Sequence, residues 1–267
     1  MPAPRTSRKR QRSYDAEKLR TAVLAQFAAL RTAVEALTPE QLAAPTRLGD
    51  WTVRELAAHL TMAVGMLPRA LAEPAPARAE LTLMDYPALT APAAPAIDTR
   101  VHELAAAPLG ELYAQVAEGL DTYLPAGVDG ERPLAHRVGA MTLTTALVTR
   151  AVELAVHTDD LNDALPGLGL PVERQLLAAA TRFLADALAV KAPGASTEVR
   201  IPPFAVVQCV EGPRHTRGTP PNVVETDPLT WIRLATGRTS WRTALDDAAV
   251  SASGERADLE ALLPIMA

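Results

Sequence analysis

Three side chains that can bind a metal lie in two separate apolar stretches. Glu153 and His157 are four residues apart, and this spacing places both side chains on one face of a helix. His59 lies in the second stretch, among apolar neighbours. Two imidazoles and one carboxylate are typical ligands of a catalytic zinc site, in which a fourth position stays open. The residue types therefore indicate a divalent metal site that can admit water or a substrate.

Two further polar residues extend the pair into a stripe. Arg150 precedes Glu153 by three residues, and Asp160 follows His157 by three. If this face points inward, each group needs a partner or a metal. Asp160 could orient His157 through its other ring nitrogen, and Arg150 could pair with Glu153. A solvated helix face or a hydrogen-bonded core histidine would produce the same pattern, and the spacing alone leaves these alternatives open.

Five helices are expected to position these residues. The sequence predicts them over 14–37, 52–67, 108–124, 140–165 and 171–191. Thr52 and Glu55 form a capping box at the start of the helix that carries His59. Pro68 is expected to end or kink that helix. The proline-rich stretch 74–99 is expected to form a linker or lid and no long helix.

After residue 195 the predicted secondary structure changes from long helices to short strands and short helices. Short strands are predicted over 198–201, 205–210, 222–225 and 248–252, and helices over 227–234, 241–247 and 255–264. This is an α+β pattern. The expected organisation is a basic tail over 1–13, a metal-binding helical bundle over 14–192 and a small α+β domain over 196–267.

Composition excludes several classes of protein. The 267 residues are 48% hydrophobic and 21% charged, which is typical of a globular protein. Residues 1–12 carry five of the 26 basic side chains and no acid, so the remainder has 21 basic and 31 acidic residues. An acidic body gives no electrostatic reason to bind nucleic acid, and the basic tail, expected to be disordered, is the one exception.

The expected location is the cytoplasm. No stretch approaches the ~20 apolar residues that span a bilayer, and no apolar segment of a secretory signal follows the basic tail. Cys209 is the only cysteine, so a disulfide within the chain is excluded and a reducing compartment is the simplest one. Cys209 lies in a predicted strand and is expected to be a buried core residue.

Two motifs carry a resemblance to a known family. The segment LGDWTVRELAAHL, residues 48–60, resembles the region around the first metal-binding histidine of the mycothiol-dependent maleylpyruvate isomerase family. Residues 150–161 resemble its second motif, Arg-x2-Glu-x3-His-x2-Asp-Leu. The resemblance implies a DinB-like up-down helical bundle that binds zinc through His59, Glu153 and His157. It also places Arg150 and Asp160 next to a thiol cofactor.

The C-terminal part resembles the sterol-carrier-like domain that follows the bundle in this family. The recognisable piece is residues 226–238, which ends in a Gly-Arg pair. In the family an arginine of this domain reaches toward the active site, and Arg238 is the candidate for this catalytic role. A cation that caps its helix is the alternative. The family uses a second arginine from the linker, for which Arg69, Arg78 and Arg100 are candidates.

The resemblance implies a metal-dependent enzyme, with zinc as the expected metal and mycothiol or a similar low-molecular-weight thiol as cofactor. The metal would lower the pKa of the thiol, and the thiolate would add to a small, carboxylate-bearing electrophile, for isomerisation or thiol transfer. The alternative function is that of a non-catalytic carrier of a lipid or another small apolar ligand, because sterol-carrier-like domains usually enclose an apolar cavity.

Overall fold

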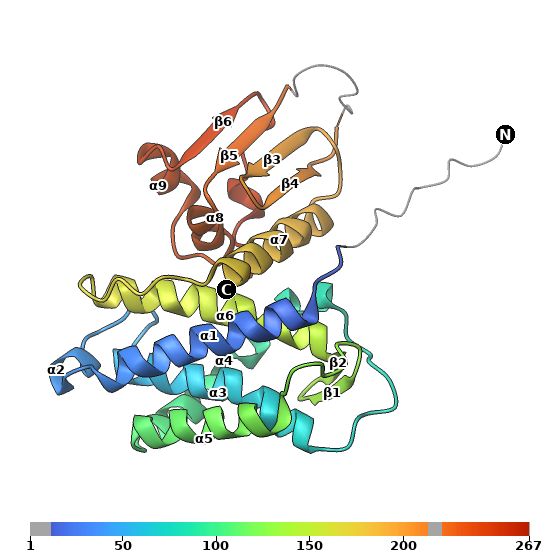
Figure 1. Cartoon of the computed structure of the whole chain (residues 1–267). Helices are drawn as coiled ribbons and strands as arrows, with labels where there is room; N and C mark the ends of the chain where they lie inside the picture. Colours follow the sequence, from blue (N-terminus) through green and yellow to red (C-terminus); the bar gives the residue numbers. More distant parts are fainter. Residues whose placement is uncertain (1–11, 213–220, 267) are drawn as a thin grey trace.

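The computed structural model describes residues 12–212 and 221–266. It has a helical bundle in its N-terminal part and a small domain of mixed helix and sheet in its C-terminal part (Figure 1). The expected α+β class is therefore confirmed. The tail segment 1–11 lies outside the described residues.

The bundle begins with α1 and continues to α7, which links it to the C-terminal domain (Figure 1). Its helices are α1 (Ala16–Glu35), α2 (Pro39–Leu42), α3 (Val53–Ala72), the 3-10 turn η1 (Leu83–Asp85), α4 (Pro87–Ala105), α5 (Leu109–Tyr123), α6 (Leu143–Ala164) and α7 (Arg174–Lys191). A two-stranded antiparallel hairpin, β1 (Pro133–His136) and β2 (Gly139–Thr142), precedes α6. The sequence prediction missed this hairpin.

Helix α6 is the central element of the bundle. It packs against α1, α3 and α7, and it is buried on nearly all sides from Leu143 to Leu161. A helix of this kind shows little amphipathic contrast, because even its polar residues face other parts of the protein. The polar stripe of α6 is therefore inside the molecule, and the alternative of a solvated face is excluded.

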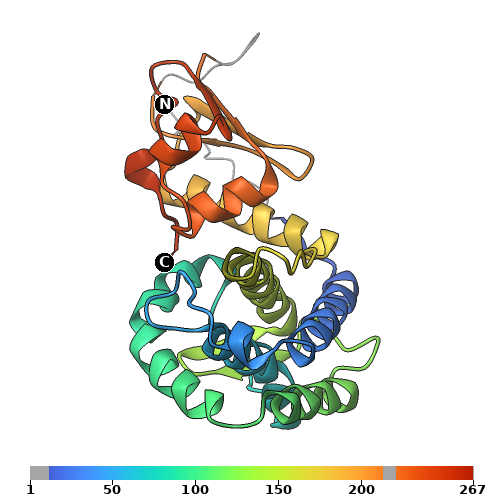
Figure 2. The ribbon, with the colours of Figure 1, turned by 90° about the vertical axis from the view of Figure 1, so that its left-hand side faces the viewer.

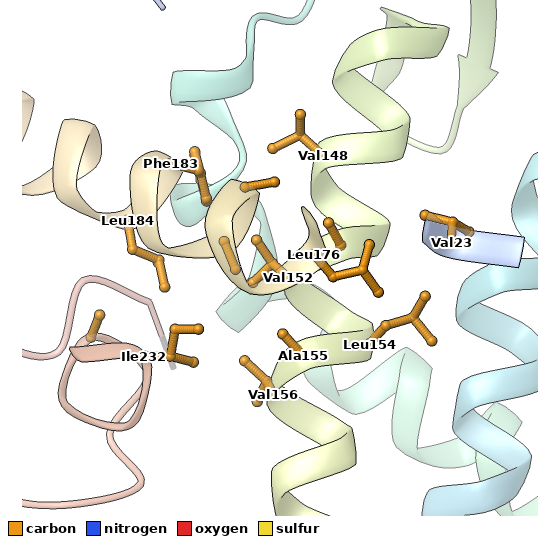
Figure 3. Close-up of a cluster of buried hydrophobic side chains, with 14 of the residues drawn as sticks. Val23, Val148, Val152, Leu154, Ala155, Val156, Leu176, Phe183, Leu184 and Ile232 are labelled. Atoms are coloured by element: carbon orange, nitrogen blue, oxygen red, sulfur yellow. The ribbon is translucent and has the colours of Figure 1, made fainter. Parts of the chain in front are cut away.

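Helix α7 connects the two parts of the molecule. It packs against α6 on one side and against β4 and α8 on the other. In Figure 3, apolar side chains of α6, α7 and α8 form one continuous cluster that includes Val152, Phe183, Leu184 and Ile232. The bundle and the C-terminal domain therefore share a core across α7. Figure 2 shows this helix running between the two parts.

The C-terminal domain is built on a sheet with the strand order β4-β3-β5-β6. Strand β3 pairs parallel to β5, and the other neighbours are antiparallel. Alternate residues of β3 and β4, including the buried Cys209, face the core, as expected for a sheet packed on one face. Its elements are β3 (Thr197–Ile201), β4 (Ala205–Cys209), β5 (Val223–Thr226), α8 (Pro228–Ala235), α9 (Trp241–Asp246), β6 (Val250–Ser253) and the 3-10 turn η2 (Glu260–Leu262).

The first correction concerns Pro68, which does not end its helix, because α3 continues to Ala72. A β-carbon built on Gly119 of α5 would come within 3.0 Å of the Pro68 ring, so α3 and α5 approach closely at this point. The close packing of these helices outweighs the single backbone hydrogen bond that proline cannot make.

The proline-rich stretch also differs from the prediction, since residues 87–105 form α4. Pro87 stands in the first turn, where a missing N–H has no consequence. Pro92 and Pro95 deprive the carbonyls of Ala88 and Ala91 of their helical partners, but both alanines are exposed to water. Packing against α3 supplies the remaining stability.

The predicted helix over 255–264 is wrong. Only the 3-10 turn η2 forms there, and the chain then extends along α8, where the backbone N–H of Ile265 donates to the carbonyl of Ala235. Ala257 and Leu259, which precede η2, are buried. The short spacing of the apolar residues in this stretch predicts a helix face, but each of them packs separately into the core.

Candidate metal centre and its cavity

Helices α3 and α6 bring the three predicted ligands together. Helix α3 carries His59, and its start is held by the expected capping box between Thr52 and Glu55. Nε2 of His59 lies 3.0 Å from Oε2 of Glu153, and Nε2 of His157 lies 3.4 Å from the same oxygen. One ligand atom from each of the three residues lies within 4.8 Å of the others. Both imidazoles thus face one carboxylate oxygen.

Tyr86 holds the other oxygen of Glu153. Its hydroxyl donates to Oε1 over 2.6 Å and accepts a hydrogen bond of 3.2 Å from Arg150. The guanidinium of Arg150 also donates to the carbonyl of Ala63. The expected contact between Arg150 and Glu153 is therefore mediated by Tyr86. The sequence does not indicate Tyr86, because this residue stands at the start of α4, in a stretch whose prolines predict a linker or lid.

Burial and neighbouring charges set the protonation of this cluster. Burial alone would raise the pKa of Glu153, but hydrogen bonds from His157 and His59 and the charge of Arg150 hold it well below its ordinary value. Burial lowers the pKa of His59. Burial acts in the same direction on His157, but hydrogen bonds to Asp160 and Glu153 outweigh it and raise its pKa. The carboxylate is thus ionised and available as a ligand.

Asp160 lies behind His157 and is fully buried. Its Oδ2 is 2.8 Å from Nδ1 of His157, while Arg47 and Arg238 donate to its two oxygens over 2.6–3.3 Å. Burial opposes ionisation, but the hydrogen bond and charge of His157 and the charge of Arg238 keep its pKa far below the ordinary value. This geometry fits the orienting role considered for Asp160.

A second carboxylate in α6 joins the two parts of the molecule. Both oxygens of Asp159 accept from Arg233 of α8, over 2.6 and 2.8 Å, and Oδ2 also accepts from Arg47 over 2.6 Å. Asp159 and Asp160 are both buried, so their charges are compensated by these arginines. We refer to Arg47, Asp159, Asp160, Arg233 and Arg238 as the arginine clasp. Arg47 and Arg233 were not among the predicted site residues.

The candidate metal centre lies in the wall of a cavity of about 1020 Å³. Helices α3, α4 and α6 and the hairpin form most of this wall, and Thr236, Arg238 and Met266 close it from the C-terminal domain. The cavity thus lies partly between the two parts of the molecule, as many ligand sites do. Arg150 lines it, whereas Asp160 does not.

The predicted arginines differ in their positions. Arg238 lines the cavity, but its guanidinium is engaged by Asp160 and by the carbonyl of Thr236. Among the linker candidates, Arg69 lines the cavity, Arg78 is exposed outside it, and Arg100 pairs with Glu103 at the surface. Whether Arg238 contacts a substrate stays a prediction.

The donor set fits a divalent metal. Two imidazole nitrogens converge on one ionised carboxylate, and Asp160 engages the remaining nitrogen of His157, as carboxylates commonly do behind a metal-bound imidazole. Nδ1 of His59 is buried with no hydrogen-bond partner among the described residues. A second acidic group of Asp50, Asp98 and His102 is exposed, so it has none of this enclosure.

A helical bundle with a two-histidine, one-glutamate centre, followed by a sheet domain, defines a restricted class of proteins. Residues 23–162 match the family described as mycothiol maleylpyruvate isomerase N-terminal domain, and residues 173–265 match the family described as bacterial SCP ortholog. The first match covers more than half of the chain, so the protein belongs to the mycothiol maleylpyruvate isomerase N-terminal domain family. This confirms the expected family, and it supports the expectation of an enzyme.

Solved structures show the same architecture along most of the chain. A crystal structure of the mycothiol-dependent maleylpyruvate isomerase has a TM-score of 0.57 and 16% sequence identity, covering 92% of this chain and 95% of that one. A histidine-to-alanine mutant of that enzyme gives the same values. Comparison with curated protein sequences gave no significant match. Within the described part of the chain, no helix is long and apolar enough to cross a membrane.

Proposed function

We propose that this protein is a metal-dependent enzyme that uses mycothiol or a similar low-molecular-weight thiol to modify a small electrophile. The observation that carries the proposal is the convergence of His59, Glu153 and His157 on one wall of a large cavity. Zinc is the metal that this donor set favours. The family supports the thiol and an activity like that of maleylpyruvate isomerase.

The residues around the site have distinct tasks in this proposal. His59, Glu153 and His157 would hold the metal, which when bound would lower the pKa of a thiol. Tyr86 fixes the rotamer of Glu153 by its hydrogen bond to Oε1, and Asp160 fixes the ring of His157. The apolar part of the cavity limits water near the reacting atoms. Arg238 would have to release Asp160 in order to contact a substrate carboxylate.

Metal content is the first test. Purified full-length protein should contain one zinc ion per chain by elemental analysis, and His157→Ala should contain far less while it keeps its helical circular dichroism. His102→Ala is the matched control, because His102 belongs to the exposed acidic group and should leave the metal content unchanged. Equal metal in both histidine variants would exclude the proposed ligand set.

Turnover is the second test. The zinc-loaded protein should accelerate isomerisation of maleylpyruvate, or the consumption of another electrophile, only when mycothiol is present. Lipid carriage is the alternative, and it predicts co-purified lipid in a protein with neither metal nor thiol-dependent turnover. Mass spectrometry of an organic extract therefore separates the two functions.

A further inference from the structure

One wall of the cavity is apolar for most of its length. Met62 and Met66 of α3 are four residues apart, and Leu89, Ala93 and Ile97 follow the same spacing on α4. Residues at this spacing form a continuous stripe along a helix. Helices α3 and α4 pack against each other, so the two stripes lie on the same cavity. We call them together the apolar wall.

The apolar wall starts beside the candidate metal centre. His59 precedes Met62 by one turn, and the lining of α3 continues past Met66 to Ala70. Ala70 is eleven positions after His59, which corresponds to about 16 Å along a helix that rises about 1.5 Å per residue. Arg69 and Glu73 line the far end, where both side chains are exposed. The wall thus leads from the metal centre toward solvent.

Other parts of the cavity lining are more polar. The loop that carries Gly49 and Asp50 and the C-terminal residues Thr236 and Arg238 contribute polar groups there. A hydrophilic thiol finds more hydrogen-bonding partners among these polar groups than along the apolar wall. The polar and the apolar parts of the lining therefore suit two different reactants that meet at the metal centre.

We propose that the apolar wall binds the hydrocarbon body of an electrophile, an α,β-unsaturated carbonyl compound with an alkyl chain or ring. This inference rests on the proposed function and names its class of substrate. The cavity of about 1020 Å³ lies at the upper end of the ~300–1,000 Å³ that ligand pockets commonly enclose. A short diacid would leave most of it unfilled, whereas a thiol and an apolar electrophile together fill it. Unbranched methionines adapt readily to varied hydrocarbon shapes.

The chemical step is an addition. The thiolate sulfur forms a bond to the β-carbon, the π-electron pair of the carbon–carbon double bond moves toward the α-carbon and carbonyl, and a proton is taken up at the α-carbon. The overall change adds S–H across the double bond, so neither an oxidant nor a reductant is required. The hydrocarbon body stays on the apolar wall throughout and contributes binding energy that a short electrophile lacks.

A homologous series separates binding from chemistry. Saturated ethyl alkyl ketones cannot react, and their dissociation constants can be measured by calorimetry with the zinc-loaded protein. Each methylene buried on the apolar wall should tighten binding by about fourfold, from ~0.8 kcal/mol per CH₂. The corresponding alkyl vinyl ketones, with thiol added, should show the same dependence of kcat/KM on chain length. A flat binding series would overturn the inference.

Two tryptophan variants locate the binding. Ala94 lines the cavity on α4. The indole of Ala94→Trp should fill the space beside the apolar wall, so that the affinity for the saturated ketones no longer rises with chain length. Val190→Trp is the matched control, because Val190 is 62% exposed on α7 outside the cavity, and it should leave the series unchanged. An equal slope in Ala94→Trp would show that the ketones bind elsewhere and would also overturn the inference.

The proposed function and the inference fail differently in these experiments. If the saturated ketones bind with the expected slope but no thiol adduct forms from the vinyl ketones, the apolar wall is supported and the thiol chemistry is wrong. If adducts form at rates that do not depend on chain length, the thiol chemistry stands and the inference is wrong. Adducts are detected by mass spectrometry.

Discussion

At the scale of single residues, the candidate centre depends on side chains that would not bind the metal themselves. Asp160 is the clearest case, because it contacts His157 on one side and two arginines of the clasp on the other. Its charge stabilises the orientation of the imidazole, and the arginines compensate that charge in a buried position. The ring orientation and the pKa of His157 therefore depend partly on residues from distant segments of the chain.

We expect Asp160→Asn to weaken zinc binding by about 10–100-fold, as changes behind a metal-bound histidine commonly do. The amide preserves the shape of the side chain but removes the negative charge that faces Nδ1 of His157. Competition with a chromophoric chelator measures the affinity. An unchanged dissociation constant in a folded variant would show that Asp160 serves only the contact between the domains.

Tyr86 provides a second prediction at this scale. Its hydroxyl donates to the buried carboxylate of Glu153, and a hydrogen bond to a charged group contributes about 1.5–3 kcal/mol. Tyr86→Phe should lower the free energy of unfolding of the metal-free protein by an amount in this range, measured in urea. Tyr123→Phe is the control, since Tyr123 is 45% exposed and should give a change near zero.

The ligand set could be predicted because Glu153 and His157 lie within one turn and His59 lies in a recognisable motif. Tyr86 and Arg47 could not, since their roles come from contacts across 67 and 113 positions of the chain, to Glu153 and Asp160. No local spacing indicates such contacts. The engagement of Arg238 by Asp160 has the same origin.

At the scale of the elements, a helix or strand could be predicted where local sequence signals determine its ends and its buried face. The capping box of α3 is one, and its effect can be measured. Thr52→Ala should lower the free energy of unfolding by about 1 kcal/mol, because the first turn loses a hydrogen-bond acceptor. Thr122→Ala is the control, since the Thr122 hydroxyl donates only to a carbonyl within α5. A loss of equal size in both variants would contradict the capping role.

The same box adds a dependence on pH. Burial opposes the ionisation of Glu55, but hydrogen bonds from Thr52 lower its pKa below the ordinary 4.5. A carboxylate whose pKa is lowered by folding stabilises the protein above its unfolded pKa, and this contribution is lost as the pH falls through the folded pKa. The difference between Thr52→Ala and the unchanged protein should therefore shrink below about pH 4.5.

Elements held by their neighbours were the ones that sequence reasoning missed. Helix α4 contains Pro92 and Pro95, so its local propensity opposes the helix, and only its packing on α3 explains it. The continuation of α3 past Pro68 depends in the same way on the close approach of Gly119. Periodicity reports the face that an element buries, but it carries no information about the surface that receives that face.

At the scale of the whole molecule, the arginine clasp holds the C-terminal domain against the helix that carries two of the candidate ligands. Arg233 donates to both oxygens of Asp159. We expect Arg233→Ala to lower the free energy of unfolding by about 1.5–3 kcal/mol, as the loss of hydrogen bonds to a charged group does.

Arg200→Ala is the matched control, because Arg200 pairs with Glu198 on the open face of the sheet, where ion pairs contribute about 0.2–1 kcal/mol. Chemical unfolding with and without zinc measures both variants. Equal losses for Arg233→Ala and Arg200→Ala would show that the clasp adds nothing beyond an ordinary surface ion pair.

The burial of the single cysteine has a consequence for work with thiols. Cys209 is 0% exposed in β4, and the chain has no other cysteine. The native protein should therefore react slowly with disulfide reagents, since access to a thiol controls its exchange. Any fast-reacting sulfhydryl counted in a mixture with the folded protein belongs to the added small molecule. Mixed disulfides between that molecule and the protein should accumulate only after the C-terminal sheet opens, so their appearance would report unfolding.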